Sequence, residues 1–210
     1  KRYSLPFRHA KLLLNNGVLG DIRNVYCYIK SGDILFPTER FKVIGRGVLA
    51  DLGVHLLDLL MWFFNYLSVE DASFVSRYSG VDDYFRARLV TDSDAVINLE
   101  VTWSDPSYRL PETYIRIKGS KGTIKVSEDY LKIEIAEPNK LLGDSTKLEM
   151  YKPHYYQGFP HVNLADPEYA IEDIHFLDCI IKRIEPVTSL RRISKTMKLV
   201  DDLYKRASHG

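Results

Sequence analysis

The sequence predicts an α+β domain in which a mostly antiparallel sheet has helices packed on one face. Polar and apolar residues alternate over residues 70–126, which is typical of half-buried antiparallel strands. Segments with helical spacing of apolar residues gather towards the two ends of the chain. The chain has 210 residues, of which 45% are hydrophobic, so it can bury a substantial core. Helices that cover one face of the sheet are the simplest packing of these elements.

The first part of the chain predicts a short helix, a strand and a long apolar helix. The stretch RHAKLLLNNGVLGD (8–21) has apolar residues at helical spacing, and its Asn-Asn-Gly is typical of a helix C-terminus. Residues 22–34 are rich in Val, Ile and Tyr and predict a strand, which a loop through Pro37 follows. Residues 47–66 predict a helix that is apolar on most sides and therefore buried.

The middle of the chain predicts a series of strands, and its end predicts two helices. The clearest strand is DAVINLEVTW (94–103), where every second residue is apolar. The segment YIRIKGSKGTIKV (114–126) predicts two strands joined by the turn at 119–122. Further strands are expected at 74–78, 84–90, 131–136 and 147–151, and helices at 168–182 and 189–206.

Charge and cysteine content argue against several classes of protein. The 29 Lys and Arg residues are scattered and balance 28 Asp and Glu residues, so nothing indicates a nucleic-acid partner. The longest apolar run, residues 54–64, contains a histidine and an aspartate and is too short to span a bilayer. Cys27 and Cys179 lie far apart without CxxC spacing, which favours a reducing cytoplasm over a disulfide framework. We therefore expect a cytoplasmic protein without a membrane partner.

The stretch FKVIGRGVLADLGVHLLDLLMWFF (41–64) contains a pattern found in dinucleotide-binding turns. Gly45, Gly47 and Ala50 form G-x-G-x-x-A. A dinucleotide site would also need a strand before the first glycine and an acidic residue about 20 positions later, and the sequence shows neither. Asp51 lies in the first turn of the predicted helix, where its charge would repel a phosphate. The sequence therefore disfavours a phosphate site here.

Ionisable residues of the same helix permit other interpretations. Asp51, His55, Asp58 and Trp62 follow at spacings that place them on one stripe of a regular helix. In a structural interpretation, Asp51 caps the first turn, His55 is a hydrogen-bonded core residue and Asp58 meets a basic residue. In a catalytic interpretation, Asp51 orients the imidazole of His55 and raises its basicity from a pKa of about 6.5. A metal site formed by Asp51, His55 and His161 lacks a compact ligand motif.

The order of these motifs resembles a known family. GRGVLADLGVHLLDLL (45–60) is similar to the signature G-G-G-x-L-x-D-x-G-x-H-x-x-D of the glucose-fructose oxidoreductase and inositol dehydrogenase family, written Gfo/Idh/MocA. Arg46 replaces the middle glycine of that signature, and no glycine precedes Pro186 where the family often has one. Other segments resemble the family in the same order along the chain: 5–25, 90–103, 115–126, 171–187 and 197–210.

The resemblance implies that residues 1–210 are a substrate-binding and oligomerisation domain with a glyceraldehyde-3-phosphate dehydrogenase-like C-terminal fold. A Rossmann domain of about 100 to 150 residues is then expected upstream. That domain would bind most of the NAD or NADP, so this part of the protein alone is expected to be inactive. The full-length protein would oxidise a sugar, a polyol or a related hydroxy compound. A non-catalytic binding or regulatory module with the same fold is the alternative.

The resemblance also implies roles for individual residues. His55 would be the general base for a substrate hydroxyl, and Asp51 would orient it and stabilise its protonated form. No metal is expected. Members of the family usually meet a second subunit through the uncovered face of their sheet, so a homo-oligomer is expected through that face. It carries Val96 and Thr102 as well as the polar Asn98 and Glu100. Loop residues that could hold the substrate hydroxyls are Tyr108, Arg109, His154, Tyr155 and His161.

Overall fold

The protein is described here from a computed structural model, which covers residues 1–32, 46–78, 80–152 and 167–208. The helical elements are α1 (Leu5–Asn15), the π-helical turn η2 (Leu49–Gly53), α3 (Val54–Phe64), the 3₁₀ turn η3 (Lys140–Leu142), α4 (Pro167–Lys182) and α5 (Leu190–Ser208). The strands are β1 (Ile22–Lys30), β2 (Leu67–Val75), β3 (Tyr84–Thr91), β4 (Val96–Thr102), β5 (Glu112–Gly119), β6 (Gly122–Ser127), β7 (Tyr130–Asn139) and β8 (Ser145–Tyr151).

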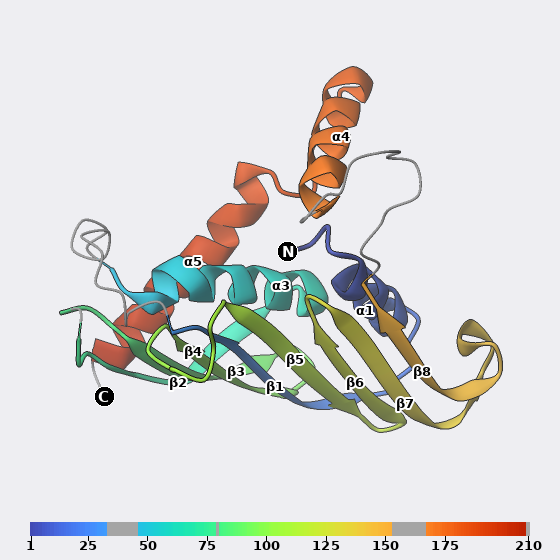
Figure 1. Cartoon of the computed structure of the whole chain (residues 1–210), viewed down its shortest axis with the longest axis horizontal. Coiled ribbons are helices and arrows are strands. Elements are labelled where there is room, and N and C mark those ends of the chain that lie inside the picture. The colour runs from blue at the N-terminus through green and yellow to red at the C-terminus, as the bar shows by residue number, and fades with distance from the viewer. Residues whose placement is uncertain (33–45, 79, 153–166, 209–210) are drawn as a thin grey trace.

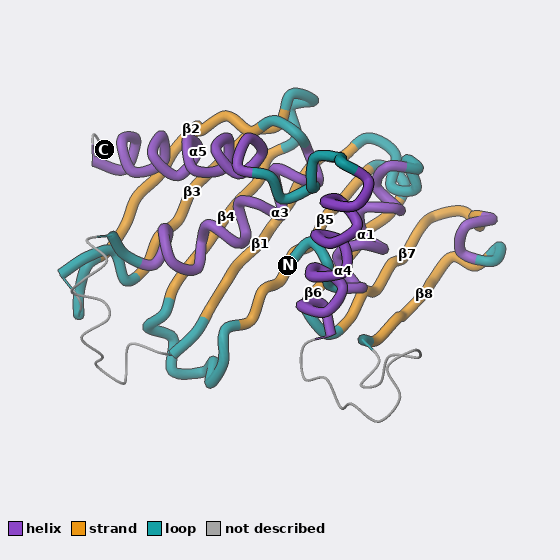
Figure 2. Tube along the Cα trace, turned by 90° about the horizontal axis from the view of Figure 1, so that it is seen from above, coloured by secondary structure: helices purple, strands orange, loops and turns teal. Residues whose placement is uncertain are grey.

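All of these strands belong to one sheet. Their order is β2-β3-β4-β1-β5-β6-β7-β8, and each neighbouring pair is antiparallel except β1 and β4. Helices α1, α3 and α5 lie over one face of the sheet (Figures 1 and 2). The predicted α+β class with helices on one face is therefore confirmed.

Most element positions agree with the sequence prediction. The strands differ at their ends and in one pairing, and the predicted helix at 47–66 is a π-helical turn followed by α3. β1 ends at Lys30 rather than at residue 34, and β2 begins at Leu67, earlier than the predicted strand at 74–78. The parallel pairing of β1 with β4 was not predicted, because alternation within a strand contains no information about the direction of its neighbour.

The core forms between the helices and the alternating apolar residues of the strands. Ile97, Leu99 and Val101 of β4 are buried as predicted. Four leucines of α3 have no exposed surface, and burial of each such side chain stabilises the fold by about 1.5–3 kcal/mol. This packing fixes α3 against the sheet. The four leucines are Leu56, Leu57, Leu59 and Leu60.

The opposite face of the sheet, called the open face here, carries tyrosines and charged residues. On β1, Tyr26, Tyr28 and Lys30 alternate with the buried residues of the core face. The ring of Tyr28 stacks on that of Tyr114, with 5.2 Å between centroids. The Lys30 ammonium lies 5.0 Å from the centroid of Tyr28 and 3.2 Å from a carboxylate oxygen of Glu100.

Candidate active site

The carboxylate of Asp82 holds the turn that leads into η2. The backbone N–H of Gly47 donates to Asp82 Oδ1 and that of Leu49 donates to Oδ2, each at 2.9 Å. The hydroxyl of Tyr204, from α5, donates to the same carboxylate at 3.0 Å. A Cβ on residue 47 would lie 2.2 Å from Asp82 Oδ1, so this close approach requires glycine. Glycine at position 47 therefore allows this turn to pack closely against Asp82.

This arrangement bears on the dinucleotide interpretation. A helix N-terminus binds phosphate through free backbone N–H groups. Here the N–H groups of Gly47 and Leu49 already donate to a carboxylate, whose negative charge would repel a phosphate. The described part of this turn therefore does not fit the pyrophosphate of a nicotinamide cofactor. Gly45 lies outside the described residues.

Arg46, which occupies the position of a signature glycine, extends to α5. Its Nη1 lies 2.7 Å from Asp201 Oδ1, and its guanidinium carbon lies 5.3 Å from the centroid of the Tyr204 ring. Both members of the ion pair are close to half exposed, so the pair contributes no more than about 1 kcal/mol. Arg46 thus ties the signature turn to the last helix.

Asp51 lies in the π-helical turn η2, whereas the sequence predicted a regular α-helix from residue 47. A π turn contains more residues than an α turn, so side chains four positions apart no longer stack as they do on a regular helix. The predicted stripe is therefore interrupted between Asp51 and His55. Single π turns are frequent at functional sites.

His55 lies in the first turn of α3 and its side chain is exposed. Crowding by protein atoms lowers the pKa of the imidazole, and the positive charge of Lys1 lowers it further. The carboxylates of Asp51 and Asp58 oppose these effects. A pKa below 6.5 leaves the imidazole neutral at pH 7, so it can accept a proton. This exposure does not fit the core histidine of the structural interpretation.

Asp58 has the structural role that the sequence left open. Arg2 Nη2 donates to Asp58 Oδ1 at 2.6 Å and Arg2 Nε donates to Oδ2 at 2.7 Å. Such paired, charge-assisted bonds are strong, and Arg2 is only 8% exposed. The guanidinium carbon of Arg2 also lies 6.0 Å from the centroid of the Trp62 ring. Asp58 and Trp62 therefore hold the N-terminal segment on α3.

The loop residues proposed to hold substrate are not brought to His55 within the described residues. The Tyr108 ring lies 6.0 Å from that of Tyr28 and 6.0 Å from the Lys30 ammonium. These contacts place Tyr108 on the open face, opposite the face that α3 covers. Arg109 follows it and is exposed. The remaining candidates, His154, Tyr155 and His161, lie outside the described residues.

Sequence reasoning missed Asp82 and Tyr204. Their hydrogen bond joins residues 122 positions apart, a separation that local spacing patterns do not report. No sequence motif connects Asp82 with Gly47, which lies 35 positions earlier in the chain.

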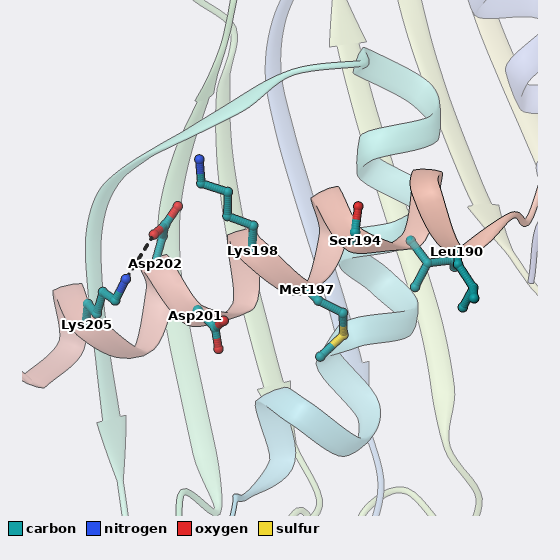
Figure 3. Close-up of a pocket in the computed structure, with 8 residues that line it drawn as sticks. Leu190, Ser194, Met197, Lys198, Asp201, Asp202 and Lys205 are labelled. Atoms are coloured by element: carbon teal, nitrogen blue, oxygen red, sulfur yellow. Dashed lines mark ion pairs between the residues drawn. The ribbon is translucent and has the colours of Figure 1, made fainter.

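A depression of about 520 Å³ lies along α5 (Figure 3). Asp202 and Lys205 form an ion pair at 3.8 Å on this helix, and Leu190 is 89% exposed at its beginning. Since all the lining residues come from one helix, this is an open surface groove, and neither Asp51 nor His55 lines it. The lining residues are Leu190, Ile193, Ser194, Met197, Lys198, Asp201, Asp202 and Lys205.

Within the described residues, no three His, Cys, Asp or Glu side chains gather in a way that could hold a metal ion. Among the helices of the described ranges, none combines the length and the apolar character needed to cross a membrane.

Comparisons with known proteins agree with this fold. D-apiose dehydrogenase of Rhizobium rhizogenes is 24% identical over 218 residues, which cover 100% of this chain and 61% of that protein. D-apiose dehydrogenase of Paraburkholderia graminis is 26% identical over 209 residues, which cover 94% of this chain and 52% of that protein. A levoglucosan dehydrogenase solved with NADH and levoglucosan superposes with a TM-score of 0.85 at 17% identity, covering 99% of this chain and 62% of that one.

The coverage shows that the chain spans between about half and three fifths of these relatives. The structural likeness, at 17% identity, establishes the shared fold. The sequence model of the family called GFO/IDH/MocA C-terminal domain matches residues 7–125, more than half of the chain. These residues include β1, the signature turn and the helix that carries His55. The chain therefore belongs to the GFO/IDH/MocA family of dehydrogenases and corresponds to its C-terminal domain.

Proposed function

We propose that this chain is the substrate-binding and catalytic-base domain of a NAD- or NADP-dependent oxidoreductase that acts on a sugar, a polyol or a related hydroxy compound. The observation that carries the proposal is the exposed position of His55 in the first turn of α3, one turn after Asp51, whose carboxylate raises the pKa of the imidazole. Relatives that oxidise D-apiose and a neighbour solved with levoglucosan support a carbohydrate substrate.

In the proposed reaction His55 removes the proton of a substrate hydroxyl. The imidazole must be neutral before the reaction, and its lowered pKa keeps it neutral at pH 7. Protonation creates an imidazolium, which the carboxylate of Asp51 stabilises electrostatically. A nicotinamide cofactor, when bound, accepts the hydride of the alcohol.

The described residues supply positioning rather than cofactor binding. Asp82, Tyr204 and Arg46 hold the turn that precedes Asp51, and the buried leucines of α3 hold the helix that carries His55. Because the described turn offers no free pyrophosphate site, the proposal assigns NAD or NADP mainly to a domain upstream of this chain.

The test is oxidation of D-apiose, levoglucosan and a panel of aldoses and polyols by the full-length protein, followed as reduced cofactor. If the proposal holds, His55→Ala lowers kcat by about two to four orders of magnitude with little change in cofactor affinity. His9→Ala is the matched control, because His9 lies on α1 and contacts the backbone oxygen of Leu5. Binding of a sugar without turnover by the wild-type protein would instead favour a non-catalytic module.

A further inference from the structure

Lys1 forms an ion pair with Glu128, the residue that follows β6. Lys1 Nζ lies 2.5 Å from Glu128 Oε1, and the backbone N–H of Thr113 donates to Glu128 Oε2 at 2.9 Å. Both oxygens of this carboxylate are therefore bound. The side chain of Lys1 is 26% exposed and that of Glu128 is 21% exposed, so water and salt screen the pair only in part. Glu128 thus neutralises much of the charge of Lys1.

The contacts of the neighbouring Arg2 place Lys1 beside His55. Arg2 binds Asp58, which lies three positions after His55 on α3 and therefore on the same side of the helix. Lys1 precedes Arg2 directly, and its charge has the largest effect of any charge on the imidazole of His55. The pair of Lys1 with Glu128 therefore lies close to the proposed base.

A further ion pair, that of Lys152 with Glu168, lies beside the same N-terminal segment. Lys152 Nζ donates to Glu168 Oε1 at 2.8 Å, and the two side chains are 14% and 17% exposed. Glu168 lies seven positions before His175 on the same side of α4, and the ring of His175 lies 5.7 Å from that of Tyr3. In Figure 1 the N-terminus lies near the base of α4. The three cations of this region, Lys1, Arg2 and Lys152, thus all have a carboxylate partner.

These ion pairs suit a ligand with hydroxyl groups better than an anionic ligand. Sites for carboxylates and phosphates usually offer an arginine or a lysine whose charge is available to the ligand. Here an anionic substrate would have to displace a carboxylate from a partly buried pair, or tolerate its repulsion. A hydroxyl group can donate to a carboxylate oxygen and accept from an ammonium group while the pair stays formed.

We infer that the protein selects uncharged sugars and polyols over sugar acids and sugar phosphates, and that Glu128 is a positioning residue for this selection because it neutralises Lys1. The inference rests on the proposed function and narrows its substrate class. Glu128 acts through Lys1, so the effect of changing it depends on whether Lys1 is present.

The test compares the sugar of the panel that has the highest kcat/KM with its uronic acid and with its phosphate monoester. The full-length protein is used at about pH 8, where a base with a pKa below 6.5 is neutral in every variant. Glu128→Gln keeps the size of the side chain and an acceptor for the N–H of Thr113, but it releases the charge of Lys1. Lys1→Met combined with Glu128→Gln removes both charges.

Glu134→Gln is the matched control. It makes the same substitution on β7, in an ion pair with Lys147 whose side chains are 67% and 72% exposed. Circular dichroism checks the fold of each variant.

We expect the wild-type protein to prefer the uncharged sugar by about tenfold or more in kcat/KM, because an added negative charge meets carboxylates. Glu128→Gln should reduce this preference by about fivefold or more, mainly by lowering KM for the acid and the phosphate, since the released ammonium group can bind their charge. The double variant should regain the wild-type preference, and the control should keep it.

An equal or higher kcat/KM for the acid or the phosphate in the wild-type protein would overturn the inference. An unchanged preference in folded Glu128→Gln, or an equal loss of preference in Glu134→Gln, would overturn the role of Glu128. If Glu128→Gln does not fold, the wild-type comparison and Lys1→Met decide, because Lys1→Met leaves the carboxylate unpaired and should increase the discrimination against anions.

Calorimetric titration of the panel and of its acids and phosphates, with cofactor present, measures the same preference without turnover. A wild-type protein that binds the uncharged compounds more tightly but oxidises none of them would contradict the proposed function and leave the inference supported. Oxidation of acids and uncharged sugars with equal efficiency would do the reverse. Binding of none of these compounds would contradict both.

Discussion

The charge balance around His55 decides whether this side chain can act as a base. Crowding and the positive charge of Lys1 lower the pKa of its imidazole, and the carboxylates of Asp51 and Asp58 limit that change. Asp58 also forms an ion pair with Arg2, and the contribution of Asp51 to the pKa of His55 is larger than that of Asp58.

This balance predicts the pH dependence of alcohol oxidation by the full-length protein. Because the pKa of His55 is lowered, the base stays neutral until the pH falls below 6.5, and kcat/KM should decline only below that value. Asp51→Asn removes a charge that raises this pKa, so the acid limb should move to lower pH while the plateau falls. The measurement is a pH–rate profile of both proteins, with Asp92→Asn, an exposed aspartate, as the control.

An acid limb that stays in place in Asp51→Asn would contradict the assigned electrostatic contact. A shift of the acid limb to higher pH in Asp51→Asn would also contradict this contact, because loss of a nearby negative charge lowers the pKa of the imidazole.

At the scale of elements, the turn before α3 is held by a carboxylate from another part of the chain. Burial raises the pKa of Asp82, although the hydrogen bonds from Leu49, Tyr204 and Gly47 act in the opposite direction. Removal of the ionised carboxylate from water therefore destabilises it by more than these hydrogen bonds stabilise it. The benefit of Asp82 is that two buried N–H groups and a hydroxyl have an acceptor.

Asp82→Ala should lower the free energy of unfolding by about 1–3 kcal/mol, because it leaves buried backbone donors without a partner. Asp202→Ala is the matched control on α5. Asp202 pairs with Lys205 at 3.8 Å near the surface, and its loss should change stability by less than about 1 kcal/mol. Urea denaturation followed by circular dichroism measures both. Equal losses in the two variants would show that Asp82 does not anchor the turn.

At the scale of the whole molecule, the open face is suited to an interface. Tyr26, Tyr28 and Tyr114 form an aromatic row, with Arg116 Cζ 5.7 Å from the centroid of Tyr26. Aromatic residues and arginine are enriched where proteins meet, since they bury large areas and keep polar contacts. We therefore propose that the homo-oligomer forms through this face.

Tyr28→Asp should weaken that oligomer by about tenfold or more, because it removes a stacked ring and places a charge beside Glu112, which accepts the Tyr28 hydroxyl at 2.6 Å. Tyr66→Asp is the control, as Tyr66 is exposed at the end of α3 and outside the open face. Sedimentation over a range of concentrations measures the change. A wild-type protein that remains monomeric at tens of micromolar would refute the proposal.

Periodic elements and the candidate base could be predicted from the sequence. The alternation in DAVINLEVTW placed Ile97 and Leu99 in the core, and the structure confirms both. The spacing within residues 45–60 selected Asp51 and His55, although their catalytic roles stay predictions. The strand inference succeeds because a side chain's direction along a strand is set by its position in the chain.

Contacts between distant segments were decided by the tertiary structure. The sequence by itself determined which elements form and which of their sides are apolar. It did not show that β1 lies parallel to β4, that Tyr108 joins the open face, or that Asp82 meets Tyr204. It also did not show that the apolar side of α4 points outward. The physical reason is that periodicity depends on neighbours in the chain, whereas the partner of a buried carboxylate or an apolar helix side depends on how all the elements pack together.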